Sequence, residues 1–229
     1  MELYIGNRKY SSWSLRVWLY LRHHEIPFKV VKLSLDTPGF ASGVAGVAPT
    51  SRVPALVVKA EGAPRGDLHL WETTSILEYL AERFPATNGW PADADARAVA
   101  RCVSAEMHAN FPALRAHLPF NASRSPRPRA TWPGGKLDSD VARLIALFED
   151  CRKRFGVPSG AGPYLFGAFC AADCMLAPAA LRLHQYAVPL QHAPLASAYV
   201  AAVVAHPAVR DWVAAGAAEA EIIASEEVD

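Results

Sequence analysis

The sequence lacks three features that would each mark a particular class of protein. It has no apolar run near the roughly 20 residues of a membrane-spanning helix, and its first residues lack the basic-then-apolar pattern of a secretory signal. Its four cysteines form no Cys-x-x-Cys pair, so they indicate neither a zinc site nor a disulfide framework. Its formal net charge of +1 is too small for binding nucleic acid by charge alone. We therefore expect a cytoplasmic protein without a metal, a nucleic-acid partner or a membrane contact.

Hydrophobic residues, in contrast, make up 52% of the 229 residues. Such a content with so little net charge predicts a packed core rather than disorder. The first third of the chain follows the order β-α-β-loop-β-β-α, which indicates a small mixed α/β layer. Strands are expected at residues 2–5, 27–35, 53–58 and 68–71, helices at 14–24 and 73–84, and a turn at 61–67.

Residues 85–93, PATNGWPAD, combine proline, glycine and small polar residues without periodicity, which is typical of a linker. Beyond them the chain shows only helical patterns and loops. Helical runs cover residues 95–118, with a bend at Pro112, then 139–155, 171–187, 196–206 and 208–224. The sequence thus predicts two domains, an α/β domain at 1–84 and an all-helical domain at 94–229.

Three serines stand in the stretch YSSWS, residues 10–14, where the first strand gives way to the first helix. In thioredoxin-like redox folds this turn carries a Cys-x-x-Cys pair. Here serines stand in both places, so a thiol used at this turn must be borrowed, and glutathione is the thiol to which this points. The competing interpretation is that the serines simply cap the helix.

A helix N-terminus suits a borrowed thiolate. Its unpaired N–H groups and the positive end of its dipole favour an anion, and a serine hydroxyl can donate to the sulfur. Lowering a thiol pKa by about 2 units takes about 2.7 kcal/mol. A hydrogen bond to a charged group contributes roughly 1.5–3 kcal/mol and the dipole about 0.3–1. The two together suffice without a nearby lysine or arginine.

Two further segments fit a peptide ligand. Val53 and Pro54 begin a strand, where a cis bond would present the backbone of Val53 to an extended peptide. Glu72 and Thr73 begin a helix, whose N–H groups can hold a carboxylate while Glu72 pairs with an ammonium, the two charged groups of a γ-glutamyl end. An ordinary strand-edge proline and an acidic helix cap are the alternatives.

These elements, in this order before an all-helical region, resemble the glutathione S-transferase family, and YSSWSLR is most similar to its serine-type, zeta-like members. The resemblance implies a thioredoxin-like N-terminal domain plus an all-α helical bundle. By the same resemblance, Ser11 takes the catalytic position with Ser12 beside it. The glutathione-binding residues it implies are Arg52, Val53, Pro54, Glu72 and Thr73, with Arg52 near the glycine carboxylate.

The resemblance also implies an enzyme: a homodimeric glutathione transferase of the detoxification kind, with glutathione as co-substrate and a small hydrophobic electrophile. Trp13 stands where the zeta class has a cysteine, which argues against maleylacetoacetate isomerase. We expect Trp13, Met107, Asn110 and Phe111 to line the electrophile pocket, although residues so spaced on a helix often belong to the core.

Three other functions stay open. A glutathione-dependent cis-trans isomerase would share the site but release free glutathione. A glutathione-dependent reductase or peroxidase would oxidise the thiol, and the missing active-site cysteine speaks against it. A non-catalytic glutathione-binding module would bind glutathione without turning over any electrophile.

Overall fold

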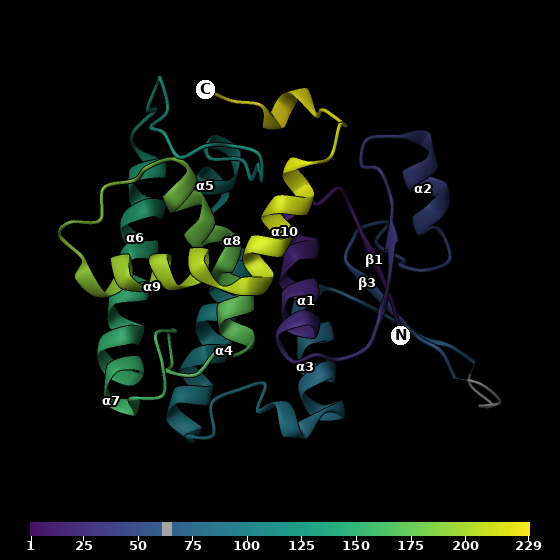
Figure 1. The fold of residues 1–229 in the computed structure, drawn as a ribbon, viewed down its shortest axis with the longest axis horizontal. Helices are drawn as coiled ribbons and strands as arrows, with labels where there is room; N and C mark the ends of the chain where they lie inside the picture. The colour runs from purple at the N-terminus through teal and green to yellow at the C-terminus, as the bar shows by residue number, and fades with distance from the viewer. Residues whose placement is uncertain (61–65) are drawn as a thin grey trace.

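The structure, a computed structural model, describes residues 1–60 and 66–229. Its sheet has four strands, β1 (Glu2–Ile5), β2 (Lys29–Lys32), β3 (Ala55–Val58) and β4 (Leu68–Trp71), in the order β2-β1-β3-β4 (Figure 1). β1 runs parallel to β2 and antiparallel to β3, and β4 runs antiparallel to β3. The central strands β1 and β3 supply the buried Leu3, Ile5 and Leu56, whereas each edge strand has two partly buried middle residues and exposed residues at its ends.

Three helices accompany the sheet: α1 (Ser12–His23), α2 (Pro38–Val44) and α3 (Thr73–Arg83). The predicted loop between the second and third strands in fact holds α2, a seven-residue helix with Thr37 as its cap and Pro38 at its start. Its two glycines weaken helical propensity, so the sequence showed no helical pattern there. Part of the predicted turn at 61–67, residues 61–65, lies outside the described residues.

The rest of the described chain is helical. Its α-helices are α4 (Ala94–Ala109), α5 (Pro112–His117), α6 (Lys136–Cys151), α7 (Val157–Ser159), α8 (Ala171–Gln185), α9 (Pro194–Ala205) and α10 (Pro207–Ala217). Short turns of other helix types lie at Pro85–Thr87, Arg152–Gly156 and Ala224–Glu226. We call β1 to α3 the sheet part and α4 to α10 the helical part. Figure 1 shows them side by side, with α1 and α8 where they meet.

Two predicted helices are shorter than expected. The run at 95–118 is two helices rather than one bent helix, because Phe111 adopts a left-handed conformation, with φ at 62°, just before Pro112. The run at 208–224 stops at Ala217, and the chain beyond it turns back to the sheet part.

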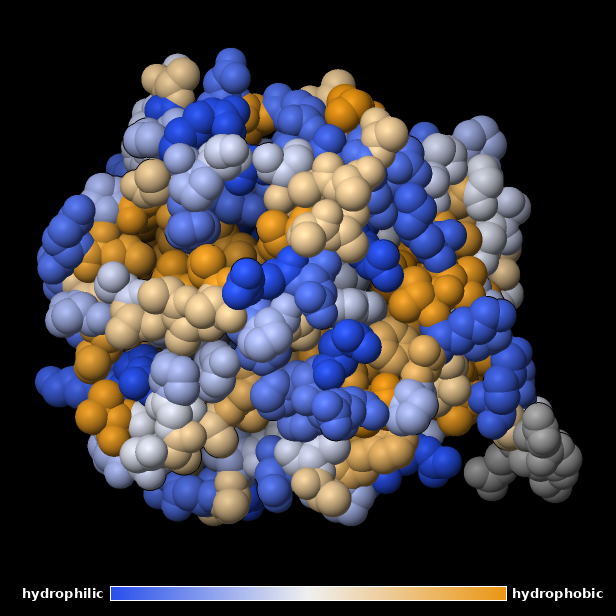
Figure 2. All heavy atoms as spheres, in the orientation of Figure 1, coloured by the Kyte–Doolittle hydropathy of each residue, from blue (hydrophilic) through white to orange (hydrophobic). Residues whose placement is uncertain are grey.

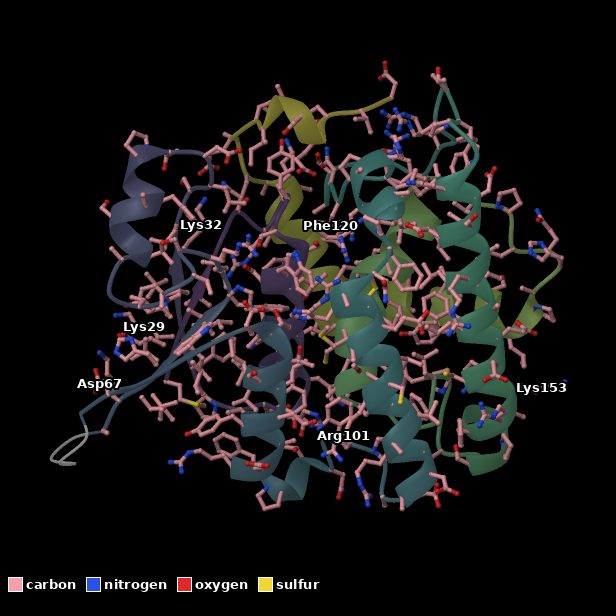
Figure 3. The ribbon with its side chains drawn as sticks, turned by 180° about the vertical axis from the view of Figure 1, so that it is seen from behind. Lys29, Lys32, Asp67, Arg101, Phe120 and Lys153 are labelled. Atoms are coloured by element: carbon pink, nitrogen blue, oxygen red, sulfur yellow. The ribbon has the colours of Figure 1, made fainter. Side chains whose placement is uncertain are left out.

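One continuous core joins the two parts. α8 packs against α1, α4 and α9, and all its residues except His184 are buried. Trp18 on α1 meets Trp212 on α10 with ring centroids 5.2 Å apart. Figure 3 places the fully buried Phe120 in the interior, where the parts meet. Among the described helices, none is long and apolar enough to cross a bilayer.

Candidate functional site

A cavity of about 280 Å³ lies where the sheet part meets α4 and α5. Its lining consists of Trp13, Thr50, Arg52, Val53, Pro54, Glu72, Thr73, His108 and Arg115. The structure therefore brings together six of the residues named from the sequence, from three separate segments. It adds Thr50, His108 and Arg115, which the sequence reasoning did not include.

Val53 and Pro54 directly precede β3, and its pairing with β4 places them near Glu72. The peptide bond between Val53 and Pro54 is cis. In the antiparallel pairing of β3 with β4, Ala55 lies opposite Trp71, so the residue before β3 lies near the residue after β4. Glu72 has φ at 66°, a conformation that costs energy for a residue other than glycine and that is held by its surroundings.

The start of α3 presents a polar wall of the cavity. Glu72 is the N-cap residue of α3, and its side chain makes no capping bond. Its carboxylate lies 3.6 Å from Nε2 of His108, whose Nδ1 lies 3.2 Å from the Thr74 hydroxyl. Thr73 is almost fully buried. The helix N–H groups of α3 and the charge of Glu72 are thus both available for a ligand with one carboxylate and one ammonium.

The serine turn lies behind this cavity. Ser11 is the N-cap of α1: its Oγ accepts from the Ser14 N–H at 3.4 Å and donates to Ser14 Oγ at 2.7 Å. Ser12 accepts from Arg182 Nη2 at 3.4 Å. Both serines are buried, and neither lines the cavity, whose lining at this end is Trp13. The structure therefore shows Ser11 in the capping role that was the competing interpretation.

Three arginines surround the serine turn. The guanidinium of Arg16 lies 4.0 Å from the Trp13 ring and that of Arg115 lies 5.9 Å from it. Arg16 is fully buried, and its Nη1 donates to the Ser12 carbonyl at 3.0 Å. Burial, together with the charges of Arg182 and Arg115, holds the Arg16 pKa well below its usual range. Burial likewise lowers the Arg182 pKa to about 10.

Arg115 lines the cavity and Arg16 lies against Trp13 of the same lining, so both cations add positive potential there. Among the described residues, no carboxylate lies within ion-pair distance of Arg16, Arg115 or Arg182. The sequence contained one sign of a buried cation: Arg16 interrupts the apolar face of the helical stretch SLRVWLYL. A cation on such a face is buried when the helix is covered on both sides.

The cavity lining supplied by α4 differs from the prediction. Met107 and Phe111 are buried in the core, and Asn110 is the exposed C-cap of α4, so none of the three lines the cavity. Met107 lies seven residues after Ala100 and four after Val103, on the face of α4 that packs inward. His108 is turned by about 100° from Met107 and reaches the cavity instead.

A larger, mostly apolar hollow of about 1060 Å³ lies elsewhere, between the end of α8, α9 and α10. Figure 2 shows hydrophobic side chains gathered around it on the face of α9 seen in Figure 1. It contains none of the residues predicted to bind glutathione, so the smaller cavity is the candidate site. The part of the chain that the structure describes holds no cluster of three potential metal ligands.

Comparisons with known proteins identify the family that the sheet part matches. Residues 10–83 match the family model of the glutathione S-transferase N-terminal domain. No curated protein matches the chain. The solved maleylacetoacetate isomerase from Anaeromyxobacter dehalogenans, which has glutathione in its active site, is 26% identical, with a TM-score of 0.64 over 92% of this chain and 93% of that one.

Two other solved structures extend the likeness. A maleyl pyruvate isomerase, a bacterial glutathione S-transferase of the zeta class, is 24% identical, with a TM-score of 0.64 over 96% of this chain and 99% of that one. A tau-class glutathione S-transferase from mango is 16% identical, with a TM-score of 0.68 over 93% and 91%. The chain therefore has the glutathione S-transferase fold along nearly its whole length, and its residues 10–83 belong to the glutathione S-transferase N-terminal domain family.

Proposed function

We propose that this protein is a glutathione transferase, which ionises the glutathione thiol and directs it at a small electrophile. The observation that carries the proposal is the single cavity that joins Val53 and Pro54, Glu72 and Thr73, and the first turn of α1. Each segment suits one portion of glutathione, and one extended ligand of its length and charge pattern can use all three.

In this proposal glutathione lies extended beside Val53. Its γ-glutamyl carboxylate accepts from the N–H groups at the start of α3, and its ammonium pairs with Glu72. Arg52 and Arg115, both at the cavity, are available for the glycine carboxylate or for an anionic substrate. Without a ligand, His108 lies against the Glu72 carboxylate. In the proposal the ammonium of glutathione takes the place of His108 there.

The sulfur then lies at the N-terminus of α1. Ser11 turns its hydroxyl from Ser14 Oγ to the sulfur and stabilises the thiolate, with the helix dipole and the buried Arg16 and Arg182 adding positive potential. The thiolate forms a bond to an electrophilic carbon. The thiolate electron pair forms this C–S bond. In a substitution the leaving group departs with the electron pair of its own bond, and in an addition the electrons of the conjugated double bond shift away from the attacked carbon and then take up a proton.

An isomerase is the second candidate. Two structural neighbours are named maleylacetoacetate isomerase and maleyl pyruvate isomerase, and the cationic lining with Arg52 and Arg115 suits a substrate that bears carboxylates. In this reaction the thiolate adds to a double bond, the bond rotates, and glutathione leaves unchanged. Trp13, in place of the cysteine of the zeta class, makes transferase chemistry our first choice.

The proposal includes an organisation for the molecule. Residues 1–84 form the glutathione-binding domain, 85–93 the linker and 94–229 the domain that receives the electrophile. The protein acts in the cytoplasm as a homodimer, in detoxification. The cationic cavity favours a more polar electrophile than the hydrophobic one expected from the sequence.

The test is an ultraviolet difference titration of the protein with glutathione across pH. We expect a thiolate band below the pKa of the free thiol, and we expect Ser11→Ala to remove the band and slow turnover while glutathione still binds. Ser12→Ala is the matched control. If Ser12→Ala loses the thiolate band and Ser11→Ala keeps it, Ser12 rather than Ser11 stabilises the thiolate.

Product analysis separates the remaining functions. Glutathione retained in the product identifies a transferase, and free glutathione with a rearranged substrate identifies an isomerase. Glutathione disulfide identifies a reductase or peroxidase. Binding with neither a thiolate band nor turnover of any electrophile would leave the non-catalytic module.

A further inference from the structure

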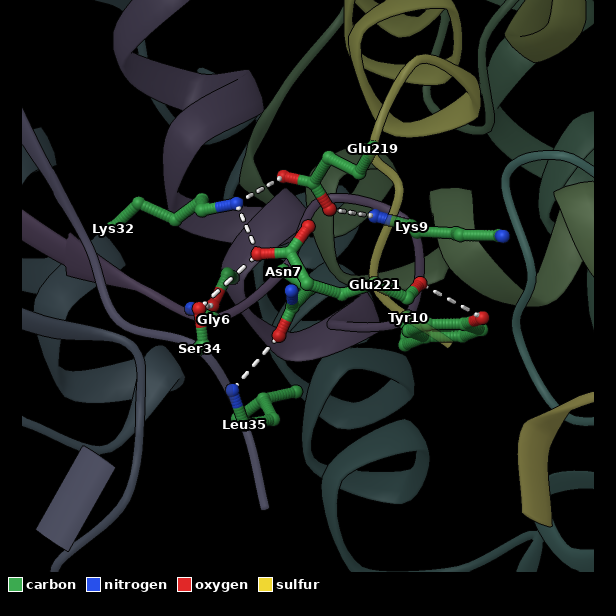
Figure 4. Close-up of polar contacts among 10 residues, drawn as sticks. Gly6, Asn7, Lys9, Tyr10, Lys32, Ser34, Leu35, Glu219 and Glu221 are labelled. Carbon is green, nitrogen blue, oxygen red and sulfur yellow. Dashed lines mark hydrogen bonds and ion pairs between the residues drawn. The ribbon is translucent and has the colours of Figure 1, made fainter. Parts of the chain in front are cut away.

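The chain after α10 returns to the sheet part and lies against the turn that precedes Ser11 (Figure 1, Figure 4). We call residues 219–228 the strap. Its first contacts are exposed: Glu219 and Glu221 lie 3.4 Å and 2.9 Å from Lys32 Nζ, and Glu221 also accepts from Ser34. Figure 3 shows Lys32 on the sheet from the opposite side, close beneath this strap.

The strap also binds the turn itself, through the backbone of Lys9. The Lys9 N–H donates to Glu219 Oε2 at 3.1 Å, and the Lys9 carbonyl accepts from the Ala122 N–H at 2.8 Å. The backbone N–H and the backbone carbonyl of Lys9 are therefore both hydrogen-bonded to groups outside the sheet part. A turn residue held in this way cannot shift without breaking contacts to the strap or to the loop after α5.

The side chains of the same turn meet at Glu227. Its Oε1 accepts from the Tyr10 hydroxyl at 2.6 Å and lies 3.5 Å from Lys9 Nζ, and its Oε2 accepts from Asn121 Nδ2 at 2.9 Å. The Lys9 side chain is only 8% exposed. The Glu227 side chain is 38% exposed, so the ion pair itself is only partly shielded, and the hydrogen bonds from Tyr10 and Asn121 do most to fix the geometry.

Lys9 and Tyr10 directly precede Ser11, and the N–H groups of Tyr10 and Ser11 both donate to the Asn7 carbonyl. The three residues thus form one tight turn. We infer that Glu219 and Glu227 are positioning residues for Ser11: the strap holds the serine turn in the geometry that the proposed thiolate chemistry requires. This inference rests on the proposed function and on Ser11 as the donor to the sulfur.

The expected effect is on turnover rather than on glutathione binding. Glu72, Thr73 and Val53, which bind glutathione in the proposal, make no contact with the strap among the described contacts. We expect Glu227→Ala to lower kcat about 10- to 100-fold, since a small misplacement of a reacting group has such an effect. The KM for glutathione should stay within about twofold of wild type.

Glu221→Gln is the matched control, because the Glu221 side chain binds Lys32 and Ser34, and only its backbone carbonyl, which the variant keeps, accepts from the Tyr10 hydroxyl at 3.4 Å. Its side chain should be dispensable for kcat. Tyr10→Phe is the second variant: it removes a single hydroxyl and keeps the ring, so it remains informative should Glu227→Ala fail to fold. We expect it to lower kcat in the same direction.

The deciding measurement combines Glu227→Ala with Ser11→Ala. If the strap acts through Ser11, Glu227→Ala lowers the thiolate band and kcat in the wild type but has little further effect on kcat in Ser11→Ala. Equal losses in both backgrounds, or an unchanged band in Glu227→Ala and Tyr10→Phe, would overturn the inference. A wild type without a thiolate band would overturn the proposed function, and the inference with it.

Discussion

At the scale of single residues, the site is organised around Trp13. The guanidinium carbon of Arg16 lies 4.0 Å from its ring centroid and that of Arg115 5.9 Å, and the ring meets the His108 ring edge-on with centroids 5.3 Å apart. Such stacking lets two cations lie close together without an acid between them, because the ring faces attract both. The positive potential reaches the cavity through these contacts.

Arg16 offers a direct test of that potential. Replacing it by methionine in Arg16→Met keeps the volume in α1 and removes the charge. We expect the pKa of the bound glutathione thiol to rise by about 1 unit, since a cation near an anion favours its charged form. The ultraviolet titration with glutathione measures it. Arg22→Met is the control, because Arg22 is exposed at the far end of the same helix and pairs with Asp211. An unchanged thiol pKa in Arg16→Met would refute the role.

At the scale of elements, α8 is the helix on which the helical part is built, and Asp173 secures its start. The carboxylate of Asp173 accepts from the backbone N–H of Cys170 at 2.9 Å and of Leu165 at 3.1 Å, fully buried. Cys170 completes a capping box, in which its thiol accepts from the Asp173 N–H.

Removal of that carboxylate should be costly. We expect Asp173→Ala to lower the free energy of unfolding by about 2–4 kcal/mol, because two buried N–H groups lose their acceptor. Urea unfolding followed by circular dichroism measures the change. Asp95→Ala, in the exposed first turn of α4, should change it by no more than about 0.5 kcal/mol. A loss in Asp173→Ala no larger than that of the control would contradict the expectation.

The elements also show what the sequence could predict. Periodic apolar runs located the strands and most helices, since burial on one face leaves a pattern in the sequence. The pattern missed α2, whose seven residues bury only Val44. It also placed Met107 and Phe111 in the cavity, because spacing along a helix gives a face but not the neighbour that covers it. His108 and Arg115 depend on how α4 and α5 pack against the sheet part, which no local pattern contains.

At the scale of the whole molecule, histidines join the two parts. Nδ1 of His23 on α1 lies 2.9 Å from Nε2 of His206, and His206 Nδ1 accepts from the Ala208 N–H at the start of α10. The neutral His206 therefore donates through Nε2. Burial, followed by the His23 charge, lowers the pKa of both His206 and His24 to about 4, and burial lowers that of His23.

The sign of the resulting pH dependence follows from linkage. In the unfolded chain His24 and His206 take up protons near their usual pKa of about 6.5, whereas in the folded chain they do so only near pH 4. Stability should therefore be constant above about pH 6.5 and fall as the pH drops from there to about 4, by at most about 1.4 kcal/mol per pH unit for each histidine.

His206→Asn tests this, because asparagine keeps an N-cap acceptor for α10 and cannot titrate. We expect a shallower loss of stability between pH 6.5 and 4 than in the wild type, measured by urea unfolding at each pH. His192→Asn, at an exposed loop position, is the control and should leave the slope unchanged. If the slope for His206→Asn equals that of the wild type, the pair of His23 and His206 is not the source of the pH dependence.

Because α1 is buried on both sides, it limits which segments of this chain can be exchanged with those of a relative. The helix belongs to the sheet part by its position in the chain, yet Arg16 donates to the Met175 carbonyl of α8 and Trp18 packs on Trp212 of α10. A transplanted sheet part would bring with it a cation and an indole shaped for this one helical partner. The two parts are therefore not interchangeable modules, and exchanges with distant relatives should succeed only when α1 and α8 move together.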